Sequence, residues 1–162
     1  MIAKAFRQFC YDVEWGECDY LVIDLPPGTG DVQLAMVENL PVHGAVIVTT
    51  PQDVALIDAH KAVSMFENLD VKVLGLVENM AFYACRHCGK EDDIFGHEGV
   101  HSMGAHRGLE ILASLPLDRR VRETSDEGDP LAAPNHEERS PMWWSRFRDL
   151  AESVKTKLGS VG

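Results

Sequence analysis

Short, nearly continuous apolar runs recur along the 162-residue chain and are separated by amphipathic stretches. The first run covers residues 20–25 and stops at Pro26 and Pro27. A run of this kind is typical of a strand that is buried on both faces of a parallel sheet. Similar runs rich in β-branched residues predict further strands at residues 44–50, 72–79 and 109–115.

The stretches between these runs have the apolar spacing of helices. Residues 2–14 predict a helix with one buried stripe, and residues 31–39 predict a short helix. A third helix is predicted from a capping hydroxyl at Thr50, proline at position 51 and an acid at Asp53, and it runs to about residue 68. A last helix is predicted to begin at residues 140–141. The stripe of the first helix comprises Ile2, Phe6, Phe9 and Val13, and that of the last comprises Trp143, Phe147, Leu150, Val154 and Leu158.

The alternation of strands and helices predicts the fold class. Consecutive strands joined by helices form a mostly parallel sheet with helices on both faces. The chain, residues 1–162, is therefore expected to be a single three-layer α/β domain. Trp143, Trp144 and Phe147 are expected to pack in its core or in a dimer contact.

Two stretches interrupt this alternation. Residues 81–107 contain two cysteines and four of the seven histidines, and they are expected to form a metal-binding loop. Residues 123–139 are acidic and rich in proline and glycine, which predicts a solvated surface loop.

The first candidate site is the string DLPPGTGD at residues 24–31, directly after the first predicted strand. Ligands bind at the carboxyl ends of strands in open α/β sheets. Asp24 has the position from which nucleotide hydrolases hold Mg²⁺ through water, and the glycines let backbone N–H groups approach phosphate oxygens. The alternative is a tight turn at a helix N-terminus, because glycine and aspartate occur in turns for conformational reasons alone.

The second candidate site is the C-x-x-C pair Cys85 and Cys88, followed by Gly89. This spacing lets two thiolates face one metal, and the glycine permits a tight turn. Four-coordinate zinc or a [4Fe–4S] cluster needs four ligands, so a C₂ dimer or histidines of the same chain would have to complete the site. The candidate histidines are His87, His97, His101 and His106, all of which also fit as polar loop residues.

The cysteine spacing leaves several interpretations open. Iron–sulfur, zinc and incidental thiols remain possible from the spacing alone, and a redox dithiol is a further alternative. A redox pair normally opens a helix beside its own βαβ unit, which Cys85 and Cys88 do not. Cys10 and Cys18 fit small structural residues.

The stretch YLVIDLPPGTGDVQLAM, residues 20–36, resembles the switch II and Walker B region of the Mrp/NBP35/ApbC iron–sulfur cluster carriers. These are P-loop NTPases with a deviant Walker motif, related to the MinD and ParA proteins. The resemblance continues through VIVTTPQDVALIDAHKAVSMF, VLGLVENMAFYACRHCGKEDDIFG and LASLPLDRRVRETSDEGDP, and covers residues 1–131.

The resemblance implies a role for each candidate residue. Asp24 would hold the Mg²⁺-bound water, and Cys85 and Cys88 would hold a [4Fe–4S] cluster that bridges two copies of the chain. A [2Fe–2S] cluster fits two cysteines per chain equally well by ligand count. The residues expected to sense the γ-phosphate are Gly28, Thr29 and Gly30, and those expected to lie against the adenine are Asn79, Pro116, Leu117 and Asp118.

The phosphate-binding loop of that family is missing from these 162 residues. Gly89 is the one glycine followed by lysine, and Glu91 then stands where a Walker A motif has Ser or Thr. The switch I acids are also missing, as is the first strand, which the family places centrally beside the Asp24 strand. We therefore expect an incomplete P-loop-NTPase-like sheet with unpaired edges, and ATP hydrolysis by the chain alone that is slower by orders of magnitude.

Charge and composition narrow the functional classes. Acidic residues outnumber basic ones by 26 to 15, giving a net charge of −11, which disfavours nucleic acids and anionic membranes as partners. Residues 1–20 lack the apolar core of a signal peptide, and no apolar run approaches the roughly 20 residues of a membrane helix. We expect a cytoplasmic protein with reduced cysteines.

Three functions fit the sequence. The first is a homodimeric carrier that binds an iron–sulfur cluster at Cys85 and Cys88 and transfers it to recipient apoproteins. The second is a nucleotide hydrolase of the MinD/ParA class that uses Asp24 and the loop at residues 28–30. The third is an interaction module stabilised by zinc. Binding of ATP and Mg²⁺ is expected from the resemblance alone.

Overall fold

A computed structural model describes residues 5, 7–26, 28, 30–85, 87–131, 133, 138 and 141–159. Its main sheet is parallel and has the order β1 (Ala45–Thr49), β2 (Val73–Glu78) and β5 (Ile111–Ser114). A second, antiparallel sheet pairs β3 (Tyr83–Ala84) with β4 (Glu91–Asp92). The helices are η1 (Gln8–Asp12), α2 (Asp31–Asn39), α3 (Asp53–Asn68), α4 (Gly99–Arg107), α5 (Arg119–Asp126) and α6 (Pro141–Gly159).

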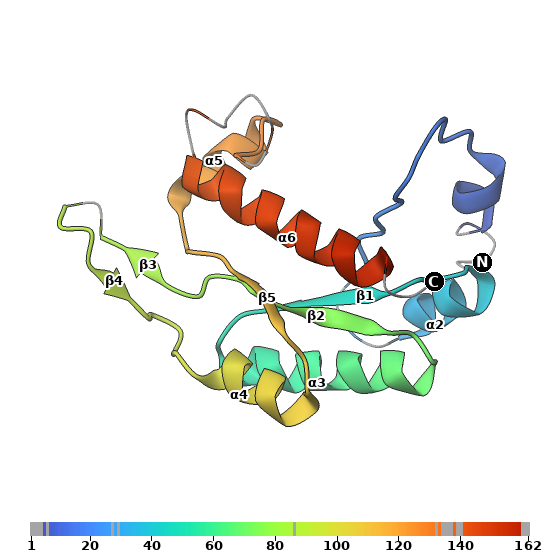
Figure 1. Cartoon of the computed structure of the whole chain (residues 1–162), viewed down its shortest axis with the longest axis horizontal. Coiled ribbons are helices and arrows are strands. Elements are labelled where there is room, and N and C mark those ends of the chain that lie inside the picture. The colour runs from blue at the N-terminus through green and yellow to red at the C-terminus, as the bar shows by residue number, and fades with distance from the viewer. Residues whose placement is uncertain are drawn as a thin grey trace.

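The predicted three-layer α/β architecture is confirmed. Helices α3 and α4 cover one face of the main sheet, and α6 crosses the other face (Figure 1). Successive side chains of β2 point to opposite faces, so Leu76 joins the core under α3 and α4, whereas Val77 packs with Trp143 of α6. The central strand is thereby buried on both sides, as its continuous apolar run predicted.

The predicted strand at residues 20–25 is wrong. These residues form no ladder with any described strand, and Val22 is 90% exposed, while Ile23 and Leu25 pack against the core. An apolar run becomes a strand only when a neighbour takes up its N–H and C=O groups. The central strand that the resemblance places beside this run has no counterpart among the described strands. The β1 strand lies at the edge of the sheet, where Val48 is 62% exposed.

The predicted first helix is only partly helical. Residues 8–12 form a single π-helical turn, and Phe9 and Val13 are exposed rather than buried. Ile2 and Phe6 lie outside the described residues. Phe9 and Val13 therefore bury little of their surface, and a short helix gains little stability without such burial.

The predicted start of the third helix is shifted. Helix α3 begins at Asp53 with Gln52 as N-cap, and no side chain caps its free N–H groups. The Thr50 hydroxyl instead donates to Oε1 of Gln52 at 2.9 Å.

The predicted surface loop at residues 123–139 is also partly wrong, because α5 continues to Asp126.

The predicted last helix is confirmed as α6. Trp143 is buried and its ring lies 5.9 Å from that of Phe147, which fits the expected role in packing. Ser140, the predicted first residue, lies outside the described residues. No helix in the described part of the chain is both long enough and apolar enough to cross a membrane.

The burial of β2 predicts a large effect of truncation at its centre. Leu76→Ala is expected to lower the free energy of unfolding by about 2–5 kcal/mol, because Leu76 is completely buried between the sheet and its helices. Val54→Ala is the matched control, since Val54 is 78% exposed, and its effect should stay within about 0.5 kcal/mol. Urea denaturation measures both; equal losses would contradict the described core.

Candidate functional site at the carboxyl edge of the sheet

Backbone pairing continues beyond the carboxyl ends of β2 and β5. The N–H of Leu115 donates to the carbonyl of Glu78 at 2.8 Å, that of Ala81 donates to Leu115 at 2.8 Å, and that of Leu117 donates to Phe82 at 2.7 Å. These bonds bring the segment after β2 alongside the segment after β5. The predicted adenine-binding residues Asn79, Pro116 and Asp118 are therefore on neighbouring segments at one edge of the sheet.

A tight turn fixes Asn79 at the end of β2. Its N–H donates to the carbonyl of Thr49 at 2.7 Å, which joins it to β1 as well. Its side-chain Oδ1 accepts the N–H of Met80 at 3.0 Å, and Met80 has a positive φ of 54°. The Asn79 side chain is half-buried and terminates the strand, and its proposed contact with adenine stays a prediction.

Asp118 has a structural role that the sequence analysis did not anticipate. It is the N-cap of α5, and its Oδ1 accepts the N–H of Arg120 at 2.9 Å. Its Oδ2 accepts the Arg120 guanidinium and the indole N–H of Trp143, the latter at 3.3 Å. Partial burial raises the pKa of Asp118, but the hydrogen bonds from Arg120 and Trp143 outweigh it and lower the pKa to about 2.

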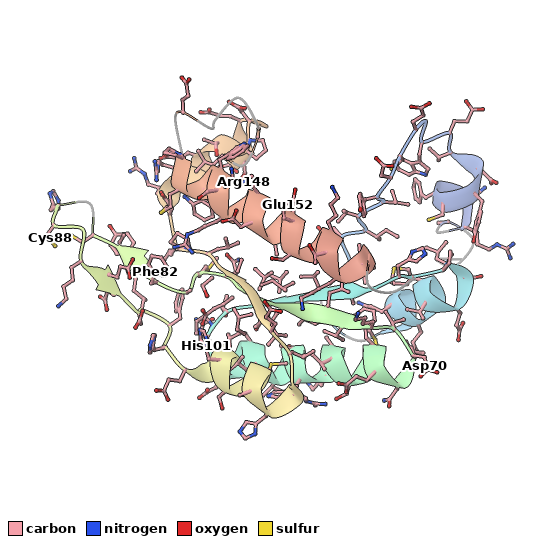
Figure 2. The ribbon with its side chains drawn as sticks, viewed as in Figure 1. Asp70, Phe82, Cys88, His101, Arg148 and Glu152 are labelled. Atoms are coloured by element: carbon pink, nitrogen blue, oxygen red, sulfur yellow. The ribbon has the colours of Figure 1, made fainter. Side chains whose placement is uncertain are left out.

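Cys85 and Cys88 lie in a hairpin that projects from this edge of the sheet. Tyr83 pairs with Asp92 and Ala84 with Glu91, and the N–H of Cys85 donates to Lys90 at 2.9 Å. Figure 2 shows Cys88 at the tip of the hairpin, far from the main sheet. The chain turns there through Gly89, whose φ of 71° is a conformation that glycine adopts readily. The glycine in the motif thus has the predicted role in a tight turn.

The turn places both sulfur atoms where they can act as ligands. Backbone N–H groups of His87 and Cys88, together with the Cys88 thiol, lower the pKa of Cys85. The thiolate is the form that binds metal, so this environment favours ligation. Cys85 is half-buried and Cys88 is exposed, and neither is in a disulfide. Cys18 is exposed, so its expected place among buried structural residues is wrong.

The histidines do not complete a metal site within one chain. His87 is at the hairpin tip, His97 approaches Asp93 at 3.1 Å, and His101 and His106 are on α4. Helix α4 itself was not predicted within residues 81–107. In the described part of the chain, no group of three or more His, Cys, Asp or Glu side chains is close enough together to hold a metal ion.

The Asp24 loop follows a segment that joins no described sheet. Asp24, Gly28 and Gly30 are exposed, and Gly28 has a positive φ of 103°. The loop is joined to α2 by Gln33, whose Nε2 donates to the carbonyl of Pro26 at 2.8 Å. Thr29 lies outside the described residues. Because residues 20–25 do not join the sheet, Asp24 is not at the end of a strand as the sequence predicted.

Comparison with known proteins decides the family. The ParA-family model described as NUBPL iron-transfer P-loop NTPase matches residues 1–155. An iron–sulfur cluster carrier protein of Haemophilus influenzae is 46% identical over 99% of this chain, which covers 44% of that protein. The iron–sulfur cluster transfer protein NUBPL of Mus musculus is 47% identical over 81% of the chain, which covers 41% of that protein.

The chain belongs to this family of iron-transfer P-loop NTPases. A nucleotide-binding protein of Archaeoglobus fulgidus, solved with ADP, has a TM-score of 0.74 and 39% identity over 88% of this chain and 56% of its own. The cell division ATPase MinD of Pyrococcus furiosus has a TM-score of 0.66 over 96% of the chain and 57% of its own, and at 23% identity it shows the fold alone. The chain spans less than half the length of the curated relatives it matches.

One residue of this family member was missed by the sequence analysis. Glu78 ends the buried strand β2 and is only 4% exposed, yet it carries a carboxylate. The Ser114 hydroxyl donates to its Oε2 at 2.8 Å, and Nε2 of His101 lies 3.6 Å from the same oxygen. The signal was available, because an acid that ends an apolar strand is the same feature that singled out Asp24.

The lowered pKa of Asp118 predicts a pH-dependent contribution to stability. Its ionised form is favoured in the folded chain, so the contribution is complete above the ordinary pKa of 3.8 and is lost as the pH falls toward about 2. Asp118→Asn keeps the cap but removes the charge. We expect its free energy of unfolding at pH 7 to be below wild type, with the difference closing by about pH 2.

Asp118→Ala provides the matched comparison, because it removes the cap as well. Relative to Asp118→Asn, it should cost about a further 1 kcal/mol at every pH, the usual effect of losing an N-cap. Denaturant titrations from pH 7 to 2 measure both variants. A difference between wild type and Asp118→Asn that stayed constant with pH would contradict the described role.

Proposed function

We propose that this chain is the cluster-binding part of an iron–sulfur cluster carrier. Two copies hold one [4Fe–4S] cluster between their Cys85 and Cys88 pairs and pass it to recipient apoproteins. The observation that carries the proposal is the position of this pair at the exposed tip of a projecting hairpin (Figure 2). The names of the relatives, iron–sulfur cluster carrier and transfer proteins, support the same reading.

Ligand number supports the requirement for a second copy. A [4Fe–4S] cluster is held by four thiolates, and the hairpin supplies two. The described residues place no third His, Cys, Asp or Glu ligand near them, so a site within one chain is incomplete. A C₂ dimer repeats the same patch on both copies and brings exactly the two missing cysteines.

Exposure of the pair suits transfer as well as binding. When the cluster moves to a recipient, each iron exchanges a carrier thiolate for a recipient thiolate, and no electron is gained or lost. An incoming thiolate must reach the iron, which requires an accessible site. Cys88 is exposed and Cys85 is half-buried, so the thiolates of a recipient protein can approach this pair.

Nucleotide binding is a proposed accessory function of the completed protein. Asn79, Pro116 and Asp118 would lie against the adenine, because they share the edge where β2 and β5 end. Asp24 would hold a Mg²⁺-bound water, and residues 28–30 would sense the γ-phosphate. The Walker A lysine is missing from the sequence, so these residues alone leave the γ-phosphate charge without its main stabilising group.

The cluster proposal predicts a specific dependence on two of the four cysteines. After anaerobic reconstitution, wild type should hold about two iron and two sulfide per chain, which is one four-iron cluster per dimer. Cys85→Ser with Cys88→Ser should hold none. The matched control is Cys10→Ser with Cys18→Ser, which removes two thiols outside the hairpin and should leave the iron content unchanged.

Metal analysis distinguishes this proposal from its alternatives. Stoichiometric zinc with no retained iron would replace the carrier by an interaction module stabilised by zinc. Iron content that was equal in wild type and in the Cys85/Cys88 variant would place any cluster elsewhere in the chain and overturn the proposal.

The second candidate function is nucleotide hydrolysis of the MinD/ParA type, favoured by the DLPPGTGD string. We expect the isolated chain to release phosphate from ATP at the rate of the buffer, with no change in Asp24→Ala, because the lysine that stabilises the γ-phosphate is missing. A phosphate-release assay measures both proteins. Turnover above the buffer rate that disappears in Asp24→Ala would favour a hydrolase.

A further inference from the structure

The buried carboxylate of Glu78 is the starting point for a second role at the sheet edge. A buried charge is costly unless it is paired and hydrogen-bonded. Here the partners are the Ser114 hydroxyl at 2.8 Å and His101, whose Nε2 lies 3.6 Å away. Ser114 comes from β5, and His101 comes from α4. Glu78 therefore connects β2 to a neighbouring strand and to a helix on one face of the sheet.

The same serine connects to the helix on the opposite face. The carbonyl oxygen of Ser114 accepts a hydrogen bond from the guanidinium of Arg146, which is on α6. The Arg146 guanidinium also lies over the ring of Phe82, 5.6 Å from its centre. A continuous series of polar contacts therefore runs from Arg146 through Ser114 and Glu78 to His101.

One end of this series contacts the first arm of the cysteine hairpin, and the other end lies in the helix that follows the second arm. Phe82 directly precedes β3, and His101 is in the first turn of α4, which follows the segment after β4. Figure 2 shows Phe82 on the first arm near the base of the hairpin, His101 at α4, which follows the second arm, and Cys88 at the tip. The backbone bond from Leu117 to Phe82 adds a further contact on the first arm.

The hairpin needs this support because its own pairing is minimal. Each of its strands has two residues, and an isolated two-stranded hairpin is marginally stable in water. Its direction must therefore be set by contacts at its base. A shared cluster requires both thiolates to meet the partner copy's pair within about half an ångström of the productive geometry.

We propose that Arg146 and His101 are positioning residues that hold the two arms of the Cys85/Cys88 hairpin through Ser114 and Glu78. The consequence for cluster retention rests on the proposed carrier function, whereas the consequence for the hairpin itself does not. Loss of the Arg146 or the His101 side chain removes the support of one arm of the hairpin. The cluster then still forms at saturating iron and sulfide, but it is released faster.

The test uses two variants and two controls from the same helices. Arg146→Met removes the guanidinium from α6, and Arg148→Met is its control. Arg148 lies over Trp144 and pairs with Asp149, on the side of α6 turned away from the sheet (Figure 2). On α4, His101→Ala removes the contact with Glu78, and the exposed His106 provides the control His106→Ala.

Hydrogen exchange of the metal-free chain tests the positioning directly. The amides to follow are those of Cys85 and Gly89 in the hairpin, with that of Leu76 in the core as reference. We expect Arg146→Met and His101→Ala to speed hairpin exchange about two- to fivefold, the effect of losing one weak side-chain contact. The core amide and both controls should match wild type. Unchanged hairpin exchange, equal acceleration in the controls, or equal acceleration of the core would overturn the proposal.

The reconstituted protein supplies the functional readout. Cluster release to an iron chelator should be about two- to fivefold faster in Arg146→Met and His101→Ala, with the iron content at saturation unchanged. A release rate equal to wild type would overturn the link from positioning to retention. If wild type itself held no iron, the carrier function would fail, and hydrogen exchange would still decide whether Arg146 and His101 position the hairpin.

Discussion

Parallel pairing of β2 with both of its neighbours is the constraint on which the rest of the structure depends. The strand is buried on both faces, so Leu76 and Val77 join the sheet to the helices on either side. Pairing with β5 continues past the carboxyl end of the strand and directs the chain into the cysteine hairpin. Asn79 and the segment at 116–118 reach the same edge for the same reason. The cysteine hairpin and the proposed nucleotide residues are thus extensions of one pair of strands.

The two candidate sites differ in whether the segments that hold them are paired in the described sheet. Cys85, Cys88, Asn79 and Asp118 depend on β2 and β5, which are present and paired. Asp24 was expected to follow a strand at residues 20–25, and this segment pairs with none of the described strands. An unpaired strand edge is a hazard for aggregation, and among the described strands β1 presents one, with Val48 exposed.

Sequence patterns predicted what depends on local or short-range rules. The apolar runs of β1, β2 and β5 and the stripe of α6 identified most of the architecture. The Cys85/Cys88 motif with Gly89 predicted a tight turn, but not the two short strands of the hairpin around it. The prediction of a strand at residues 20–25 failed because an apolar pattern indicates that a segment tends to be buried. It does not indicate whether a neighbouring strand is present to pair with that segment. The contacts of Arg146 with Ser114 and Phe82 join residues far apart in the sequence, and no periodicity or motif indicates them. The buried Glu78 could have been found from the sequence, because it is an acid that ends an apolar run, as Asp24 does.

The central claim is that two chains share one cluster through their hairpins, and native mass spectrometry under anaerobic conditions tests it most directly. The reconstituted protein should appear as a dimer carrying four iron and four sulfide, and removal of the iron should return it to monomer. A monomer that retains a metal ion, or a dimer whose mass and association do not change when iron is removed, would contradict the claim.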